Sequence, residues 1–303
     1  MTISVCTLAH GRADHLANLV RGLNAQQRPP EELVIAVMQE GLYDLPTVTF
    51  PIRQLPMSGG TIPLAAARNA AARAASGRHL VFLDVDCIPD PDLIADYARL
   101  LEKHDVLLMG EVLYLPRGAL DQGIDFGRFA RIAEQHSERA APPVDELGDC
   151  SDYRCFWSLN FAMRRATFAA VGGFDEAYVG YGGEDTDFGR AATTAGVPLH
   201  WARGARAYHQ YHPHHMPPVH HLESVIANAT IFRDKWGHFT MEHWLKAFTL
   251  MGLIKLVDGA YIRARDVTSD DLAFTQIQSD EPYASSARVL AALDAGRPAI
   301  AQE

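Results

Sequence analysis

The sequence predicts an α/β protein with a mainly parallel central sheet, flanked by helices and followed by a C-terminal helical appendage. Three observations favour this class. Short apolar runs rich in β-branched residues alternate with helical patterns of 10–15 residues, as βαβ units require. Start and stop signals, such as Pro63 before one helix and Ser76-Gly77 after it, separate these runs. From residue 219 the pattern turns helical, and 303 residues suffice for one large domain with an appendage.

The elements can be placed in order along the chain. Strands are expected at residues 3–8, 33–38, 52–55, 79–83 and 106–115, and within 155–163 and 199–208. The spacing of Leu16, Leu19 and Leu23 predicts the first helix, and Asp90-Pro91 predicts the cap and first position of another. Residues 117–155 indicate one helix and long loops, and residues 219–262 indicate helix. We expect a domain boundary at residue 237, with 238–303 packed on the domain formed by 1–237.

The composition excludes several classes of protein. The chain has 27 basic and 37 acidic residues, a net charge of −10 that does not suit a nucleic-acid surface. The apolar residues 244–262 contain Lys246, Lys255 and Asp258, so they predict an amphipathic helix and no membrane span; peripheral membrane association is the second reading. The four cysteines form no CxxC pair and the N-terminus has no basic leader region, so we expect reduced thiols in a cytoplasmic protein.

The strongest local motif is Asp84-Val85-Asp86, directly after the apolar run at 79–83. In an extended segment the two carboxylates point to the same side, at the strand end where α/β sheets bind ligands. A divalent cation with oxygen ligands would relieve their repulsion. An acidic turn ahead of a helix is the alternative reading.

A second motif combines three glycines and three acids, from Gly180 to Asp187. Glycines permit unusual backbone angles and close approach to a ligand. The helix dipole alone would explain one acid in the first helical turn, but Glu184 and Asp185 are adjacent. The pattern therefore favours a closing loop followed by a general base over an ordinary helix start.

Two weaker motifs follow. Six histidines lie between residues 209 and 221, without zinc-site spacing, and His209 and His212 are the better ligand candidates because they end a strand-like run. Ser58-Gly59-Gly60 precedes the helix that carries Arg68, and such a loop can bind phosphate, although no Walker sequence is present. For both motifs, surface histidines and an ordinary loop are the simpler alternatives.

Together these motifs resemble a family 2-type GT-A glycosyltransferase. The run ARNAAARAASGRHLVFLDVD (67–86) is similar to one block of that family. FAMRRATFAAVGGFDE (161–176) and GYGGEDTDFGRA (180–191) resemble the donor-closing half of β-1,4-galactosyltransferases, polypeptide N-acetylgalactosaminyltransferases and chondroitin polymerase domains. NATIFRDKWG (228–237) has a bacterial family 2 pattern, and the blocks occur in the family's order.

The resemblance implies a metal-bound nucleotide-sugar donor. Asp86 would coordinate Mn²⁺ (or Mg²⁺) on the diphosphate, and Asp84 would contact the ribose or a metal-bound water. His209, or His212 nearby, would complete the metal site. Arg68 could reach the diphosphate. The donor's base and ribose would lie beside residues of the first strand and its exit loop, namely Thr7, Ala9 and Arg12.

The resemblance also implies an inverting reaction on an acceptor hydroxyl of a carbohydrate or another molecule. Asp185 would be the base and Glu184 would hold the acceptor or the donor sugar. Tyr181, Gly182 and Gly183 would close over the donor. One departure concerns the nucleotide: Met38-Gln39-Glu40-Gly41 stands where many members have Asp-Asp-Gly-Ser, so the UDP preference is less secure than the reaction type.

Three other functions compete with this interpretation. A metal-dependent nucleotidyltransferase would be expected to carry a more basic, glycine-rich loop than residues 8–12. A nucleotide-sugar hydrolase would need no acceptor. A non-catalytic metal- or sugar-binding protein would use the histidine cluster and leave the Gly180–Asp187 motif unexplained.

Overall fold

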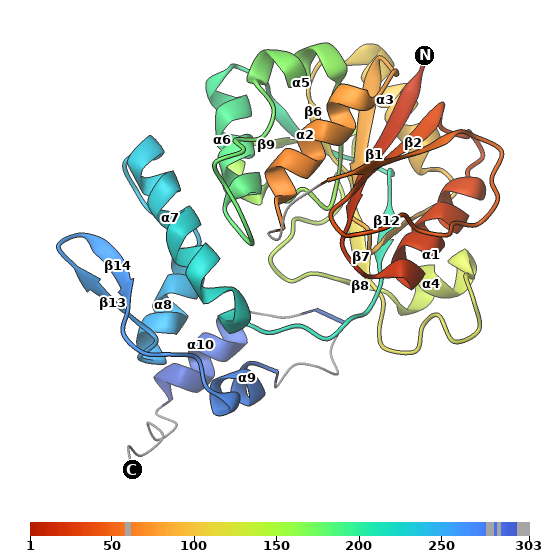
Figure 1. Ribbon diagram of the computed structural model, residues 1–303. Helices are drawn as coiled ribbons and strands as arrows, with labels where there is room; N and C mark the ends of the chain where they lie inside the picture. Colours follow the sequence, from red (N-terminus) through yellow and green to blue (C-terminus); the bar gives the residue numbers. More distant parts are fainter. Residues whose placement is uncertain (58–61, 277–281, 284–285, 296–303) are drawn as a thin grey trace. The chain divides into compact units, whose positions relative to one another are not determined.

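The computed structural model describes residues 1–57, 62–276, 282–283 and 286–295 (Figure 1). The predicted Ser58-Gly59-Gly60 loop lies outside the described residues. Two compact units are present: the first comprises residues 1–176 and 184–211, and the second comprises 177–183 and the described residues from 212 onward. The predicted domain boundary at residue 237 stays a prediction.

An eight-stranded, mostly parallel sheet forms the centre of the first unit, in the order β3-β2-β1-β4-β10-β6-β11-β9. Strands β1, β2, β3 and β4 are parallel neighbours, β10 runs antiparallel between β4 and β6, and β9 is an antiparallel edge. Their bounds are β1 Ile3–Ala9, β2 Glu32–Val37, β3 Ile52–Pro56, β4 His79–Leu83, β6 Leu107–Met109, β9 Leu147–Cys150, β10 Asn160–Arg164 and β11 Leu199–Ala202. The predicted α/β class is confirmed, because parallel strands buried on both sides read as continuous apolar runs.

Helices cover both faces of this sheet. On one face α2 (Leu64–Ala74), α5 (Arg165–Val171) and α6 (Glu184–Thr194) join a core in which Phe82, Phe161 and Phe188 are fully buried. On the other face Tyr97 of α3 (Leu93–Lys103) donates a hydrogen bond to the Asn160 side chain, 2.8 Å away. Asn160 and Phe161 are consecutive in β10 and so point to opposite faces.

A second, four-stranded sheet in the first unit has the order β5-β12-β7-β8, with β5 Cys87–Pro89, β7 Val112–Tyr114, β8 Glu134–Gln135 and β12 Ala207–His209. The single strand expected at 106–115 is wrong, because it is split at Gly110 between the two sheets. A Cβ at Gly110 would lie 2.4 Å from the Ala205 carbonyl oxygen and the Tyr97 hydroxyl, so only glycine fits this break. The strand expected within 199–208 divides in the same way.

The start of α3 also differs from the prediction. The helix begins at Leu93 with Asp92 at its cap, and Asp90 instead accepts a hydrogen bond from the backbone N–H of Asp92. The helix therefore begins two residues later than predicted, at Leu93 and not at Pro91. Helices α1 (Ala13–Asn24) and α4 (Phe126–Ile132) and the short η1 (Tyr153–Cys155) complete the first unit.

The second unit is helical with one hairpin. It contains η2 (Val219–His221), α7 (Leu222–Trp236), α8 (Glu242–Leu250), α9 (Ser269–Thr275) and α10 (Ser286–Asp294). The expected helix at 254–262 is wrong: β13 (Ile254–Val257) and β14 (Ala260–Arg263) pair there, because Asp258 and Gly259 both adopt positive φ, as a two-residue hairpin turn requires. Within the described ranges, no helix is both long and apolar enough to cross a membrane.

Candidate active site

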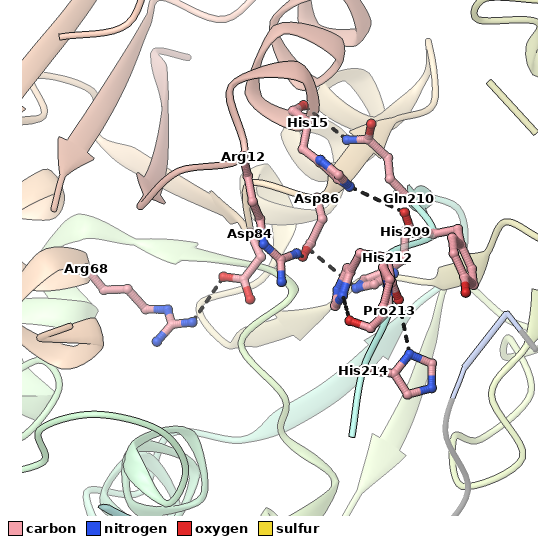
Figure 2. A network of polar contacts seen from close by, with 11 residues as sticks. Arg12, His15, Arg68, Asp84, Asp86, His209, Gln210, His212, Pro213 and His214 are labelled. Carbon is pink, nitrogen blue, oxygen red and sulfur yellow. Dashed lines mark hydrogen bonds and ion pairs between the residues drawn. The ribbon is translucent and has the colours of Figure 1, made fainter. Parts of the chain in front are cut away.

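The two acids of the Asp84-Val85-Asp86 motif lie in a turn and not in an extended segment. The backbone N–H of Cys87 donates to the carbonyl of Asp84, 2.9 Å away, which closes a four-residue turn between β4 and β5. The extended conformation expected for this motif is therefore wrong. The two carboxylates take different partners (Figure 2), yet they stay close enough for Asp86 to raise the pKa of Asp84. Both remain at the carboxyl end of β4, where α/β sheets bind ligands.

Asp86 accepts from a guanidinium and lies beside an imidazole. Arg12 Nη1 is 2.6 Å from Asp86 Oδ2, and His209 Nε2 is 3.5 Å from Asp86 Oδ1. Arg12 reaches this position because Gly11 and Arg12 both adopt positive φ between β1 and α1. The resemblance implied that His209 lies near Asp86, but it did not imply the contact of Arg12 with Asp86, because a left-handed arginine has no sequence signal.

Backbone pairing fixes the histidine. His209 is the last residue of β12 and pairs with Cys87 of β5, and the N–H of Gln210 donates to the Asp86 carbonyl, 2.7 Å away. The Gln210 side chain donates to the His15 carbonyl (Figure 2). It also accepts a hydrogen bond from the Asn18 side chain. The His209 ring also stacks on Tyr114, with 4.7 Å between ring centroids. These contacts present an oxygen and a nitrogen ligand side by side, a donor set that suits Mn²⁺.

Arg68 of α2 joins two carboxylates from distant parts of the sequence. Its Nη2 lies 3.0 Å from Asp84 Oδ1 and its Nη1 lies 3.1 Å from Glu184 Oε1. Only 4% of the Arg68 side chain is exposed, and the guanidinium also stands over the Phe174 ring. Arg68 therefore holds Asp84 and Glu184 at a fixed distance from each other. The expected contact of Arg68 with a diphosphate stays a prediction.

Two carboxyl groups in this site, those of Asp185 and Asp84, have raised pKa values. Burial raises the pKa of Asp185 to about 7, with further repulsion from Glu184 and an opposing effect of Arg68. Burial likewise raises the pKa of Asp84 to about 6, against the attraction of Arg68. Asp185 and Glu184 are the first residues of α6, and the Asp185 side chain accepts from the Thr186 N–H. A carboxylate that titrates near neutral pH is suited to take a proton from a hydroxyl.

The glycine loop is fixed within the second unit. Gly180, Gly182 and Gly183 all adopt positive φ, so the backbone conformation needs glycine there. The Asn228 side chain of α7 donates to the Gly182 carbonyl, 2.8 Å away, and the Tyr181 ring stacks on His221 and Trp244. Tyr181 is 40% exposed, so its outer surface is available to a ligand.

The other predicted residues have varied positions. Thr7 and Ala9 are buried within β1, and the Thr7 hydroxyl has no hydrogen-bond partner. His212 begins the longer of the two segments that form the second unit, and its Nδ1 lies 3.0 Å from the carbonyl oxygen of Pro213. Donor binding by Thr7 and Ala9, and metal binding by His212, stay predictions.

Two family models match separate parts of the chain. Residues 51–120 match the glycosyl transferase family 2 model, which includes Arg68, Asp84 and Asp86. Residues 141–215 match a model described as the N-terminal domain of galactosyltransferase, which includes Glu184, Asp185 and His209 among others. The two matches follow each other along the chain and together contain the acidic site described above.

Several known proteins are similar to this chain in sequence or in fold. Chondroitin synthase of Escherichia coli is 28% identical over 50% of this chain, and the chain spans 25% of its length. TarS of S. aureus superposes with a TM-score of 0.51 at 19% identity, over 77% of this chain and 66% of that one, and it has also been determined with UDP-GlcNAc. GalNAc-T7, determined with UDP, GalNAc and Mn²⁺, superposes with a TM-score of 0.51 at 15% identity, over 69% of this chain and 43% of that one. The solved structures show that the chain has a GT-A-type fold, and the two partial family matches make it similar to family 2 glycosyltransferases over residues 51–120 and to galactosyltransferases over residues 141–215.

Proposed function

We propose that this protein is a metal-dependent, inverting glycosyltransferase that moves a sugar from a UDP-linked donor to an acceptor hydroxyl. The observation that carries the proposal is the acidic site at the carboxyl end of β4, where Asp86 lies beside His209 and Arg68 links Asp84 to Glu184. Asp185, next in the chain to Glu184, has the raised pKa that a general base needs.

The donor set supports a metal. Four carboxylates gather with two guanidinium groups, so the site has an excess of acid that a divalent cation would balance. We propose Asp86 and His209 as ligands, with His212 as a third, because only two residues of chain separate the two histidines and each side chain offers one ligand atom. Mn²⁺ bound there would neutralise the charge on a leaving diphosphate. The Mn²⁺ and UDP found with GalNAc-T7 favour the same metal and nucleotide here.

The chain's own residues have separate tasks. Asp185 would accept the proton of the acceptor hydroxyl as it attacks the anomeric carbon from the side opposite the diphosphate, so the product is inverted. Glu184, held by Arg68, would orient the acceptor or the donor sugar. Arg12 would release Asp86 to the metal and would then lie beside the diphosphate, and Tyr181 with Gly182 and Gly183 would cover the donor.

Thermal unfolding with a panel of nucleotides and nucleotide sugars, each with and without Mn²⁺, tests the donor half of the proposal. A ligand of the native state raises the midpoint by mass action, so the acceptor need not be known. We expect a shift with UDP or a UDP-sugar that requires the metal. A shift with Mn²⁺ alone and none with any nucleotide would instead indicate a metal-binding protein.

The reaction itself separates the remaining alternatives. Release of UDP that depends on an added acceptor supports transfer, whereas equal release without acceptor indicates a nucleotide-sugar hydrolase. Formation of pyrophosphate from a nucleoside triphosphate and a sugar phosphate would indicate a nucleotidyltransferase. Two expectations stay predictions: that the acceptor is a carbohydrate or another hydroxyl-bearing molecule, and that the protein is cytoplasmic.

A further inference from the structure

Arg139, in the first unit, lies between two indole rings. Its guanidinium carbon is 4.6 Å from the centroid of the Trp201 ring and 5.0 Å from that of Trp157. Two hydrogen bonds fix the turn at residues 136–139. The N–H of Arg139 donates to the His136 carbonyl, and the Gln135 side chain donates to the Arg139 carbonyl. The guanidinium is therefore placed by both side-chain and backbone contacts.

This cation has no anionic partner. Nη1 of Arg139 is sealed from solvent without a hydrogen-bond acceptor, and no carboxylate forms an ion pair with the guanidinium in the part of the chain that the structure describes. Burial lowers the pKa of the Arg139 guanidinium. The groups around it that oppose this effect are tyrosines and cysteines, and none of them is a carboxylate. Stacking on two rings offsets part of the burial cost, but it leaves a planar N–H donor unused.

A small pocket adjoins the guanidinium. Its walls come from the β6–β7 connection, the segment 139–143 and the end of β11, with Arg139, Glu111 and Trp201 among the lining residues. Glu111 does not supply the missing acceptor, because its carboxylate pairs with Arg206. The pocket measures about 20 Å³, enough for a group the size of a carboxylate or one or two waters and too small for a sugar ring.

A line of aromatic contacts connects this pocket to the candidate metal ligand. His209 stacks on Tyr114, Tyr114 contacts His136 at 5.4 Å between centroids, and His136 contacts the Trp157 ring at 5.0 Å. All of these residues belong to the first unit. The pocket at Arg139 therefore lies in the same unit as His209 and is linked to it by consecutive ring contacts.

We propose that Arg139 is a specificity-determining residue that binds an acidic group, a carboxylate or a phosphate monoester, on the acceptor sugar. The planar N–H donors of the guanidinium match the paired oxygens of such a group. The inference rests on the proposed transferase function, because it assigns the ligand to the acceptor.

Binding of simple sugars to the full chain tests this directly, without donor or metal. The probes are sodium glucuronate, glucose 6-phosphate, glucose, sodium acetate and inorganic phosphate at constant ionic strength, followed by tryptophan fluorescence and by the unfolding midpoint. We expect saturable binding of glucuronate or glucose 6-phosphate at least tenfold tighter than that of glucose, acetate or phosphate. Equal binding of glucose overturns the role of the charge, and tighter binding of acetate or phosphate alone assigns a free-anion site instead.

Variants locate the site. Arg139→Gln should lose at least tenfold in affinity for the acidic sugar, and Arg139→Lys, which keeps the charge without the planar donors, should lie between it and the unchanged protein. The matched control is Arg154→Gln, since Arg154 is exposed and already paired with Asp152. Unchanged affinity in Arg139→Gln contradicts the proposal.

Stability separates binding from a structural role. Removing an unpaired buried charge should leave the unfolding midpoint unchanged or raise it, whereas a structural cation would lower it on removal. Asp86→Asn should bind the acidic sugar normally, because Asp86 serves the donor. This variant should also lose the Mn²⁺-dependent binding of UDP. In the unchanged protein, glucuronate binding without any UDP binding would count against the transferase function, and UDP binding without glucuronate binding would count against the Arg139 site.

Discussion

Arg68 Nη1 lies 3.1 Å from Glu184 Oε1, and this ion pair joins helix α2 to the first residue of α6 across 116 positions of sequence. The same guanidinium reaches Asp84 at the end of β4. One buried cation therefore fixes the spacing between the strand end that would hold the donor and the helix start that would supply the base. Its removal should affect both parts of the site at once.

Arg68→Met should destabilise the fold strongly. The substitution leaves Asp84 and Glu184 buried without their cation, and breaking a buried pair typically costs about 3–5 kcal/mol. Urea unfolding measures the loss. Arg73→Met is the matched control on the same helix, because Arg73 is 65% exposed and its pair with Glu176 should contribute no more than about 1 kcal/mol. Equal losses in the two variants would contradict the organising role of Arg68.

Asp185→Asn should keep donor binding and lose turnover. The amide cannot accept the acceptor's proton, and general bases typically contribute about 10²–10⁴-fold to the rate. The nucleotide affinity with Mn²⁺ should stay within a few-fold of the unchanged protein, because Asp185 is not among the proposed metal ligands. Full activity in this variant would exclude Asp185 as the base.

The pKa of Asp185 predicts two pH dependences. Activity that needs the ionised base should rise as the pH approaches about 7. Stability should change in the opposite sense, because the folded state holds the Asp185 proton more tightly than the unfolded chain, in which the pKa is near 3.8. Protonation of Asp185 therefore contributes fully to the unfolding free energy below pH 3.8, and this contribution is lost as the pH rises to about 7. The gain in unfolding free energy of Asp185→Asn over the unchanged protein should therefore be larger at pH 8 than at pH 5, as measured by urea unfolding at both values. A pH-independent difference would show that burial does not raise this pKa.

Arg12→Gln should strengthen metal binding. Arg12 Nη1 occupies one oxygen of Asp86, so a metal competes with it, and removing the guanidinium frees that oxygen. Isothermal titration with MnCl₂ in the absence of nucleotide should show tighter binding in Arg12→Gln and loss of binding in Asp86→Asn. With UDP present we expect the unchanged protein to bind Mn²⁺ more tightly than Arg12→Gln, because Arg12 would then lie beside the diphosphate. Weaker Mn²⁺ binding by Arg12→Gln without nucleotide would argue against this competition.

The sequence predicted the parts of the fold that depend on local pattern. The apolar runs at 3–8, 33–38 and 79–83 became β1, β2 and β4, because buried parallel strands need continuous apolar residues. The acidic motifs also indicated the two families whose models match residues 51–120 and 141–215. What local pattern does not encode is pairing over long range, such as the antiparallel insertion of β10 between β4 and β6.

The errors have specific physical causes. The break at Gly110 depends on the close approach of Ala205 and Tyr97, which are distant in sequence. The hairpin at 254–263 interrupts the helix expected over 244–262, because Asp258 and Gly259 form a two-residue turn in which both have positive φ. The Arg12–Asp86 and Arg68–Glu184 pairs join residues 74 and 116 positions apart, and no spacing rule connects them.

Gly182→Ala should weaken the attachment of the glycine loop to α7 and α8. Gly182 has a φ of +91°, and a Cβ there would lie 2.6 Å from the Met241 sulfur and 3.1 Å from the Trp244 ring, so the substitution adds crowding to backbone strain. Gly252→Ala is the matched control in the same unit, because Gly252 also has a positive φ but a Cβ would meet nothing within 4 Å. Both variants should lower the unfolding midpoint, and Gly182→Ala should lower it further. If the loop also covers the donor, Gly182→Ala alone should raise the KM for the UDP-sugar; an unchanged KM, with the extra loss of stability, would confine the loop to a structural role.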